Sequence, residues 1–344
     1  MENTINTDRY RKQAILKEFG TAGQEGLKKS SVLIAGCGAL GSVMANYLAR
    51  AGVGHIRIAD RDFIEKDNLH RQMLFDEGDI SKGLPKAVAA AEKLKGINSG
   101  IHIEPVVTDI TSENIEGLMS GMDLILDGSD NFETRFLIND ASWKNGVPWI
   151  YGGVVGTYGM SYTFIPGETP CFRCFIHEIP GPGTTPTCDT AGVLGTAVGI
   201  IASIQSTEAL KLMTGNRGAL LKKLVYADPW NGIWKFFDLR EGIPGCPVCS
   251  RETYEFLGRE RGSQTVSLCG RNSMQVTPPG KSREILPGLA ARLEPLGGLA
   301  WNEYMLRFMV DSYEITVFPD GRAIIKGTSD PSVARTLYSK YIGS

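Results

Sequence analysis

The sequence has no marked excess of charge and no long apolar run. Its 344 residues carry 36 Lys and Arg against 38 Asp and Glu, and the net charge of −2 gives no indication of binding to nucleic acid or to an anionic membrane. This balance does not exclude an acidic small ligand held locally. The longest charge-free apolar stretch, residues 191–206, is too short and too interrupted by small and polar residues to span a bilayer.

Targeting signals and histidine clusters are also missing from the pattern. The first eight residues lack the basic start and apolar core of a signal peptide, so we expect a cytoplasmic protein. The four histidines show no metal-ligand spacing, and His70, between Leu69 and Arg71, is interpreted as a loop residue. A chain of this length can form a large core and more than one domain.

Seven cysteines are present, and four of them form two Cys-x-x-Cys pairs, Cys171 with Cys174 and Cys246 with Cys249. In a reducing compartment such pairs are metal ligands or redox centres more often than structural disulfides. The two pairs match a tetrahedral Cys₄ site for one structural Zn²⁺ per chain, since all four ligand positions would be filled. Redox dithiols are the alternative.

Short β runs alternate with helical patterns in the first half, which is typical of a parallel sheet with crossover helices. We therefore predict an α/β fold with a Rossmann-like doubly wound sheet. The expected strands are residues 31–35, 55–59, 101–107, 123–126, 148–152, 160–164, 224–227 and 233–238. The expected helices are residues 39–51, 84–95, 112–119 and 131–145, followed by a buried helix over residues 191–213.

The composition changes after Ser250, which divides the chain. We predict an α/β domain with the cysteine site over residues 1–250, a linker over residues 251–265 and a small α+β domain over residues 266–344. The elements expected in the small domain are strand 267–276, helix 283–293, strands 305–310, 314–318 and 323–326, and helix 331–342.

A glycine-rich turn, Gly36-Cys-Gly-Ala-Leu-Gly41, follows the first expected strand and opens a helix. Its glycines let the backbone approach a phosphate, and the helix N-terminus offers free N–H groups and a favourable dipole. Asp60 ends the second strand, where an acidic residue takes the ribose hydroxyls in such folds. Alone, these residues fit NAD, another nucleotide or a tight packing turn.

Charged residues downstream favour a triphosphate over NAD. A nicotinamide needs apolar walls near a hydride acceptor, whereas Arg71 and Lys86 suit a triphosphate whose charge must be neutralised before a carboxylate attacks it. Asp130 follows the fourth strand, at the sheet edge where open α/β sheets bind ligands, and could hold Mg²⁺. The remaining loop charges are Asp62, Glu65, Lys66 and Asp67. We interpret most of these four as solvated.

Residues 8–250 contain a series of short motifs in a characteristic order. They are Arg9-Tyr-Arg-Lys-Gln13, Phe19-Gly…Gly23-Gln24, the glycine turn, Asn68-Leu-His-Arg-Gln72, Pro85-Lys86, Asp127-Gly-Ser-Asp-Asn131, Thr187-Cys188 and the two Cys-x-x-Cys pairs. Taken together, these motifs resemble the ThiF/MoeB/HesA family of adenylyltransferases, which act on ubiquitin-like sulfur-carrier proteins and are related to ubiquitin-activating enzymes. The whole chain is most similar to ThiF-type enzymes of thiamin thiazole synthesis.

The resemblance implies that ATP·Mg²⁺ binds at the glycine turn and that the C-terminal Gly-Gly carboxylate of a carrier protein attacks the α-phosphate. The products would be the carrier acyl-adenylate and pyrophosphate. Asp60 would hold the ribose and Asp130 would serve Mg²⁺. The residues expected to contact the nucleotide are Gly36, Gly38, Ala39, Gly41, Asp60, Asp67, Asn68, Arg71, Gln72, Lys86, Asp130 and Asn131.

The resemblance also implies a homodimer, in which a basic residue of the partner's Arg-Tyr-x-Arg-Gln segment reaches the phosphates. Here the fourth position of that segment is Lys12, and Arg11 precedes it, so either could reach across. Lysine is a point charge that lacks arginine's bidentate fork.

In such enzymes the position of Cys188 can bond covalently to the carrier or its sulfur, and a sulfur-donor protein can take part. An inert thiol is the alternative for Cys188, since MoeB-type enzymes can adenylylate without it. Cys37 and Cys269 are interpreted as packing residues. The tail has no Cys-centred loop resembling a rhodanese active site.

Three functions remain open at this stage. One is adenylylation of a thiazole-pathway carrier, and another is the same reaction on the molybdopterin-synthase sulfur carrier. The third is an NAD-dependent oxidoreductase. A zinc-stabilised scaffold without catalysis is disfavoured by the intact Arg71, Lys86 and Asp130.

Overall fold

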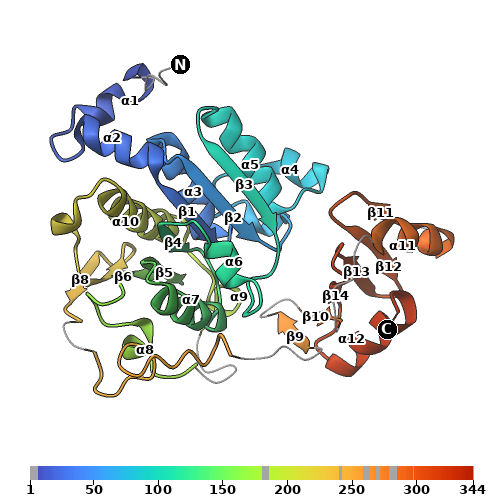
Figure 1. Cartoon of the computed structure of the whole chain (residues 1–344). Helices are drawn as coiled ribbons and strands as arrows, with labels where there is room; N and C mark the ends of the chain where they lie inside the picture. The colour runs from blue at the N-terminus through green and yellow to red at the C-terminus, as the bar shows by residue number, and fades with distance from the viewer. Residues whose placement is uncertain are drawn as a thin grey trace. The chain divides into compact units, whose positions relative to one another are not determined.

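The computed structural model describes residues 7–179, 186–239, 242–258, 264–268, 272–278, 285–296 and 298–343. The chain divides into two compact units, one formed by Met1–Cys188 with Gly192–Arg259 and the other by Asp189–Ala191 with Glu260–Ser344 (Figure 1). Within the described residues, no helix has the length and apolar character needed to cross a membrane.

The first unit is an α/β, Rossmann-like fold built on an eight-stranded sheet in the order β3-β2-β1-β4-β5-β6-β7-β8. Strands β1 to β5 are parallel, and β6 to β8 pair antiparallel. Their bounds are β1 (Ser31–Ala35), β2 (His55–Asp60), β3 (His102–Val107), β4 (Leu124–Asp127), β5 (Trp149–Val155), β6 (Tyr158–Phe164), β7 (Leu224–Asp228) and β8 (Ile233–Phe237).

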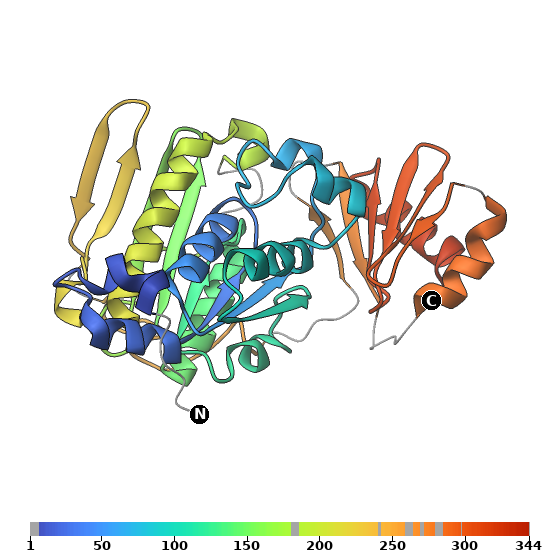
Figure 2. The ribbon, with the colours of Figure 1, turned by 90° about the horizontal axis from the view of Figure 1, so that it is seen from above.

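Helices cover both faces of this sheet, and residues 32–35 of its central strand β1 are all apolar and buried (Figure 2). Val32 and Ile34 point to the core that includes α3 (Ala39–Ala51), α5 (Lys86–Ile97) and α10 (Gly195–Met213). Leu33 and Ala35 point to the opposite core, with α6 (Ile115–Met119) and α7 (Phe132–Asn145). The other helices described between residues 7 and 219 are α1 (Thr7–Ala14), α2 (Gly20–Lys29), η1 (Lys66–Asn68), α4 (Glu77–Lys82), α8 (Phe172–Phe175), α9 (Cys188–Ala191) and η2 (Arg217–Ala219).

Helices α1 and α2 were not predicted from the sequence. Glycine is a poor helix former, and α2 contains Gly20, Gly23 and Gly26. The structure gives the reason for two of them: a Cβ on Gly23 would lie 3.3 Å from the Thr214 Cβ, and a Cβ on Gly26 would lie 2.8 Å from the Met213 carbonyl oxygen. These glycines allow α2 to pack closely on the end of α10.

Two predicted elements have different bounds in the structure. The helix expected over residues 191–213 is interrupted, because Gly192 has a positive φ of 72° and separates α9 from α10. The single strand expected over residues 267–276 is a pair of antiparallel strands, β9 (Gln264–Leu268) and β10 (Ser273–Thr277). Asn272, with φ of 43°, precedes β10, and asparagine tolerates this left-handed conformation.

The second unit contains a six-stranded sheet in the order β11-β12-β13-β14-β10-β9. Alternate residues, such as Leu306 and Phe308, join a core with α11 (Ile285–Leu293) and α12 (Pro331–Tyr341). Helix α12 begins with proline after Asp330, whose side chain accepts a hydrogen bond from the Ser332 N–H. The remaining strands are β11 (Ala300–Trp301), β12 (Leu306–Val310), β13 (Tyr313–Val317) and β14 (Ala323–Lys326).

Candidate active site

The carboxyl ends of three neighbouring strands bring the predicted nucleotide-site residues to one edge of the sheet. In the register, Ala35 of β1 pairs with Ala59 of β2 and with Asp127 of β4. The chain order reverses between β1 and β4, because β2 and β3 lie on one side of β1 while β4 and β5 lie on the other. In open α/β sheets, ligands bind outside the carboxyl ends of the strands at such a switch point.

The glycines of the turn after β1 have two different roles. A Cβ on Gly36, which has φ of 94°, would lie 2.8 Å from the Gly128 carbonyl oxygen, and one on Gly41 would lie 1.9 Å from the Gly36 oxygen. These two glycines serve packing between the turn and the end of β4. A Cβ on Gly38 would meet nothing closer than 4.0 Å, so packing does not require a glycine there. Its missing side chain leaves room above the N-terminus of α3.

The start of α3 can accept an anion. No side chain caps this helix, whose N-cap is Gly38, and Ala39 is its first residue. The first N–H groups of a helix have no intrahelical partner, and the helix dipole favours negative charge there. A phosphate is therefore a chemically suitable ligand for this helix end.

Asp60, the last residue of β2, is tied to the turn by its carboxylate. It accepts hydrogen bonds from the Cys37 N–H at 2.6 Å and the Asp62 N–H at 2.7 Å. Burial raises the pKa of Asp60, and the Lys86 ammonium opposes that rise. Lys86 and Asp60 are therefore close enough to interact electrostatically.

Lys86 is a buried cation beside this turn. It is the first residue of α5, its side chain is only 4% exposed, and its Nζ lies 3.3 Å from Oδ2 of Asp62. The Lys86 N–H also donates to the Asp62 carbonyl at 2.8 Å. Our interpretation of Asp62 as a solvated loop charge is therefore wrong, because it is a partner of Lys86. Lys66 and Asp67, by contrast, are exposed.

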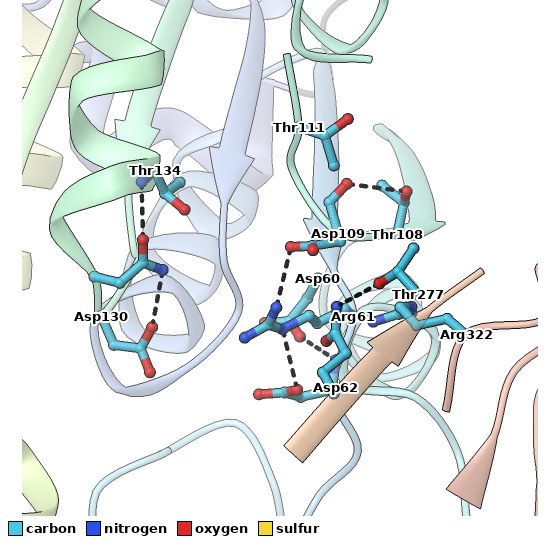
Figure 3. A network of polar contacts seen from close by, with 12 residues as sticks. Asp60, Arg61, Asp62, Thr108, Asp109, Thr111, Asp130, Thr134, Thr277 and Arg322 are labelled. Carbon is cyan, nitrogen blue, oxygen red and sulfur yellow. Dashed lines mark hydrogen bonds and ion pairs between the residues drawn. The ribbon is translucent and has the colours of Figure 1, made fainter. Parts of the chain in front are cut away.

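A second cation, Arg61, lies between carboxylates in the same region (Figure 3). Its Nη1 is 3.2 Å from Asp109 Oδ1, and its Nε is 3.7 Å from Asp62 Oδ1. Although burial alone would lower the pKa of Arg61, Asp109, Asp62, Asp130 and Asp60 together raise it. Sequence reasoning missed this residue, since an arginine inside an acidic loop has no distinctive spacing.

The loop after η1 places Arg71 near the start of α10. Arg71 is half-buried, and its Nη1 donates to the Asp67 carbonyl at 2.7 Å. A Cβ on Gly195 would lie 2.9 Å from the His70 carbonyl oxygen, so α10 begins against this loop. Asn68 and Gln72 are buried, and Gln72 Oε1 has no hydrogen-bond partner among the described residues.

The end of β4 is organised by a buried ion pair that sequence reasoning also missed. Arg135 of α7 donates from Nε to Asp127 Oδ2 at 2.9 Å, and its Nη2 donates to the carbonyls of Ser129 and Gly152. Asp127 also accepts from the Ser129 N–H and hydroxyl. Together these contacts fix the loop that leads to Asp130.

Asp130 and Asn131 occupy different positions on that loop. The Asn131 side chain caps α7 by accepting from the Thr134 N–H at 2.8 Å. Asp130 is exposed, and Figure 3 shows its carboxylate apart from the cluster around Arg61. Mg²⁺ commonly keeps several waters and takes one or two protein carboxylates plus phosphate oxygens, so one exposed carboxylate fits it.

We expect Arg135→Met to destabilise the fold by about 3–5 kcal/mol, because it leaves Asp127 as a buried charge without its partner. Chemical denaturation at pH 7 measures this change. The matched control is Lys144→Met on the same helix, which removes an exposed ion pair with Glu116 and should cost less than about 1 kcal/mol. Equal effects of the two substitutions would contradict the role given to the buried pair.

The four cysteines of the two Cys-x-x-Cys pairs converge on one point. Their sulfur atoms all lie within 4.8 Å of one another, with Sγ–Sγ distances of 3.8 Å for Cys171–Cys174 and 3.5 Å for Cys171–Cys246 and Cys174–Cys249. A tetrahedral zinc with Zn–S bonds of about 2.3 Å requires sulfur atoms roughly 3.8 Å apart. The hydrogen bond from Cys171 lowers the pKa of Cys174 to about 4, which favours the thiolate that a metal needs.

Residues 10–248, which contain the nucleotide-site residues and three of the four clustered cysteines, match the ThiF family. The chain belongs to the ThiF family.

Curated relatives agree with this assignment, and a solved structure shares the fold. The sulfur carrier protein ThiS adenylyltransferase of Bacillus subtilis is 40% identical over 341 residues, which cover 98% of this chain and 100% of that protein. The SAMP-activating enzyme E1 of Haloferax volcanii is 38% identical over 70% of this chain and 88% of its own length. The crystal structure of Escherichia coli MccB has the same fold, with a TM-score of 0.62 and 22% identity over 76% of this chain and 77% of that one.

In this ThiF-family chain, the N-terminal helix α1 carries some residues that contact the rest of the chain and others that are exposed. Arg9 donates to the Ile97 carbonyl, the Tyr10 hydroxyl accepts from Asn98, and Gln13 donates to Gln24 and to the Ala51 carbonyl. Arg11 and Lys12 are both exposed on α1. Both therefore stay candidates for a contact with a second copy of the chain.

The other cysteines of this ThiF-family chain differ in their surroundings. Cys37 is fully buried in the core, as a packing residue. Cys188 is the first residue of α9 and half-buried, with its Sγ 3.5 Å from the Val154 carbonyl oxygen. Cys269 lies outside the described residues.

The expectation for the histidines is wrong in one respect. His55 and His102 lie far apart in the sequence, but together with Glu104 they form a group whose ligand atoms are within 4.8 Å of one another. Strands β2 and β3 bring them together, and this pairing has no signature in sequence spacing. His70, as expected, is an exposed loop residue.

Proposed function

We propose that this ThiF-family chain uses ATP to adenylylate the C-terminal Gly-Gly carboxylate of a ubiquitin-like sulfur-carrier protein for thiamin thiazole synthesis. The observation that carries the proposal is a phosphate-accepting helix end next to a buried lysine at the switch point of the sheet. The match to the Bacillus subtilis ThiS adenylyltransferase supports the pathway, because it extends over the C-terminal unit. The Haloferax volcanii relative matches only 242 residues.

The proposed reaction forms one phosphorus–oxygen bond and breaks another. A carboxylate oxygen of the carrier attacks the α-phosphorus of ATP, and the bond from that phosphorus to the bridging oxygen breaks. Pyrophosphate leaves, and the acyl-adenylate remains on the carrier. Negative charge develops on the phosphate oxygens, so fixed cations and N–H donors aimed at them lower the barrier.

The chain's own residues have distinct parts in this scheme. Asp60 binds the ribose hydroxyls, and the start of α3 accepts phosphate at Gly38 and Ala39. Lys86 and Arg71 neutralise phosphate charge, and Asn68 and Gln72 also hold the phosphates. Mg²⁺, when bound at Asp130, supplies positive charge to the phosphate oxygens.

The proposal includes a cytoplasmic homodimer and a structural zinc. The exposed positions of Arg11 and Lys12 support a contact across a dimer. The sulfur–sulfur distances support one Zn²⁺ held by Cys171, Cys174, Cys246 and Cys249. A zinc site with four thiolates has no open position for substrate, so the metal would stabilise the fold.

Hydroxylamine trapping tests which carrier is the substrate. Hydroxylamine converts an acyl-adenylate into a hydroxamate, whose mass is read by mass spectrometry of the intact carrier. We expect ATP-dependent hydroxamate on the thiazole-pathway carrier and much less on the molybdopterin-synthase carrier. The reverse preference would assign the chain to the molybdopterin-synthase carrier instead of the thiazole-pathway carrier. Absence of product on both carriers, with NAD(H) retained by the purified protein, would favour an oxidoreductase.

We further propose that Cys188 takes part in sulfur transfer and not in adenylylation. Adenylylation needs a carboxylate, ATP and cations, none of which involves a thiol. Sulfur transfer needs a nucleophile that can displace AMP from the acyl-adenylate or carry a persulfide from a sulfur-donor protein, and a thiolate supplies one. Cys188, the first residue of α9, is half-buried and so is not sealed inside the core as Cys37 is.

We expect Cys188→Ala to keep pyrophosphate exchange within about twofold of wild type, because its thiol is not needed for that step. The variant should lose any carrier–enzyme species that reductant can release, and should slow thiocarboxylate formation. Mass spectrometry of the carrier, with its sulfur donor present, measures both effects. If thiocarboxylate forms at the wild-type rate, Cys188 is an inert thiol and another protein delivers the sulfur.

A further inference from the structure

His55, His102 and Glu104 form a histidine group near the amino ends of β2 and β3, at the opposite end of the strands from the nucleotide site. His55 is the first residue of β2 and His102 the first residue of β3, whereas the proposed active site lies at the carboxyl ends of the strands. In the parallel register His55 pairs with His102, and Glu104 follows two residues later on β3. Residues two apart on a strand face the same side of a sheet, so the three side chains share one face.

The side chains form a compact set of nitrogen and oxygen donors. His55 Nε2 lies 2.9 Å from Glu104 Oε2, and the two imidazole rings have centroids 4.7 Å apart. One ligand atom from each of the three residues lies within 4.8 Å of the others. An ion bound to two imidazoles and a carboxylate at about 2.0–2.2 Å holds its donor atoms roughly 3–3.5 Å from one another. Small side-chain rotations would bring the three donor atoms from their present separations to these distances.

Glu104 also contacts Arg57, and this contact leaves part of the carboxylate available. Arg57 Nε lies 3.0 Å from Oε2, the same oxygen that faces His55. Arg57 is separately held by its Nη1, which donates to the carbonyls of Leu118 and Ser120. No hydrogen bond to Glu104 Oε1 or to the ring of His102 is formed by other described residues, so both can accept a ligand.

The position of the group allows an ion to enter from solvent. β3 is the edge strand of the sheet, and His102 is exposed. Side-chain exposure is 23% for His55 and 35% for Glu104, so the donors are partly desolvated but reachable. Two imidazoles and one carboxylate are a donor set that suits zinc and neighbouring transition metals more than magnesium or calcium.

We propose that His55, His102 and Glu104 form a second metal site, which binds a divalent transition-metal ion of the zinc type and joins β2 to the edge strand β3. The ion takes the place of the proton between His55 Nε2 and Glu104, and that proton leaves to solvent. Water completes the coordination, since the chain supplies only three ligands here. The site is separate from the four cysteines and does not depend on the proposed activity.

Calorimetric titration of Zn²⁺ into tag-free protein that already carries one zinc per chain tests this site. We expect one further zinc per chain to bind. His102→Gln, at an exposed position whose ring makes no hydrogen bond to the described residues, should weaken this binding at least about tenfold without affecting folding. The matched control His70→Gln removes an exposed histidine that belongs to no metal-ligand group among the described residues, and this variant should bind zinc as wild type does.

Thermal unfolding gives a second readout, because an ion that binds only the folded state raises the melting temperature. Added Zn²⁺ should raise the melting temperature of wild type and of His70→Gln, and should leave that of His102→Gln unchanged. The proposal fails if wild type binds no zinc beyond the first, or if His102→Gln binds the second zinc and is stabilised as wild type is.

Discussion

Asp130→Asn is expected to lower carrier-dependent pyrophosphate exchange about a hundredfold to a thousandfold, without loss of stability. In the proposed mechanism this carboxylate holds Mg²⁺ against the phosphates, and removing one group that stabilises developing charge typically costs about 10²–10³ in rate. The side chain is exposed, and it accepts a 3.4 Å hydrogen bond from Asn131. Its replacement therefore has little effect on packing.

Glu133→Gln is the matched control for that substitution. Glu133 is an exposed acid in the first turn of α7, three residues further along the chain, and it should be dispensable. Exchange is measured at saturating ATP and carrier over a range of Mg²⁺ concentrations, with melting temperatures recorded for both variants. An Asp130→Asn protein that keeps wild-type exchange at every Mg²⁺ concentration would remove Asp130 from the site.

Cys171→Ser is expected to have the largest effect on stability, because it breaks the proposed zinc site at its most buried ligand. Cys171 is fully buried and its sulfur is 3.5 Å from that of Cys246. Structural zinc contributes about 10–16 kcal/mol of apparent binding free energy in small zinc-finger peptides, and this energy stabilises the folded state. The variant should lose its zinc and several kcal/mol of stability, or fail to accumulate as a folded protein.

Metal analysis and thermal unfolding measure this effect, and chelation provides a route that does not depend on the variant's folding. Wild type should contain one tightly held zinc, and a strong chelator should lower its melting temperature sharply. Cys188→Ala, which alters a cysteine outside the cluster, should keep both zinc and melting temperature. A metal-free wild type that unfolds at the same temperature, with thiols that oxidise reversibly, would instead support redox dithiols.

The sheet and the nucleotide-site motifs could be predicted because their signals are local. Apolar runs of four to five residues followed by glycine and an amphipathic segment locate β1, α3 and β2 within a residue or two. The carboxyl ends of parallel strands meet at one edge, so the positions of Asp60 and Asp130 after two strands predict that both lie at the same edge of the sheet. The two Cys-x-x-Cys pairs were similarly informative, although 71 residues lie between Cys174 and Cys246 in the sequence.

What could not be predicted depends on contacts between distant segments. The ion pairs Lys86–Asp62 and Arg135–Asp127 join a strand end to a helix, and no spacing rule identifies the partner of a buried charge. The glycines of α2 argued against a helix, whereas their role is to let α10 approach. The pairing of His55 with His102 arises from the register of β2 and β3, which local sequence does not specify.

Carrier-dependent exchange of radiolabelled pyrophosphate into ATP tests the central claim most directly. The account predicts exchange that needs ATP, Mg²⁺ and a carrier ending in Gly-Gly, and that disappears when the carrier's last two glycines are removed. Exchange that proceeds equally with the truncated carrier, or none with any Gly-Gly carrier, would contradict the proposed adenylylation of a carrier C-terminus.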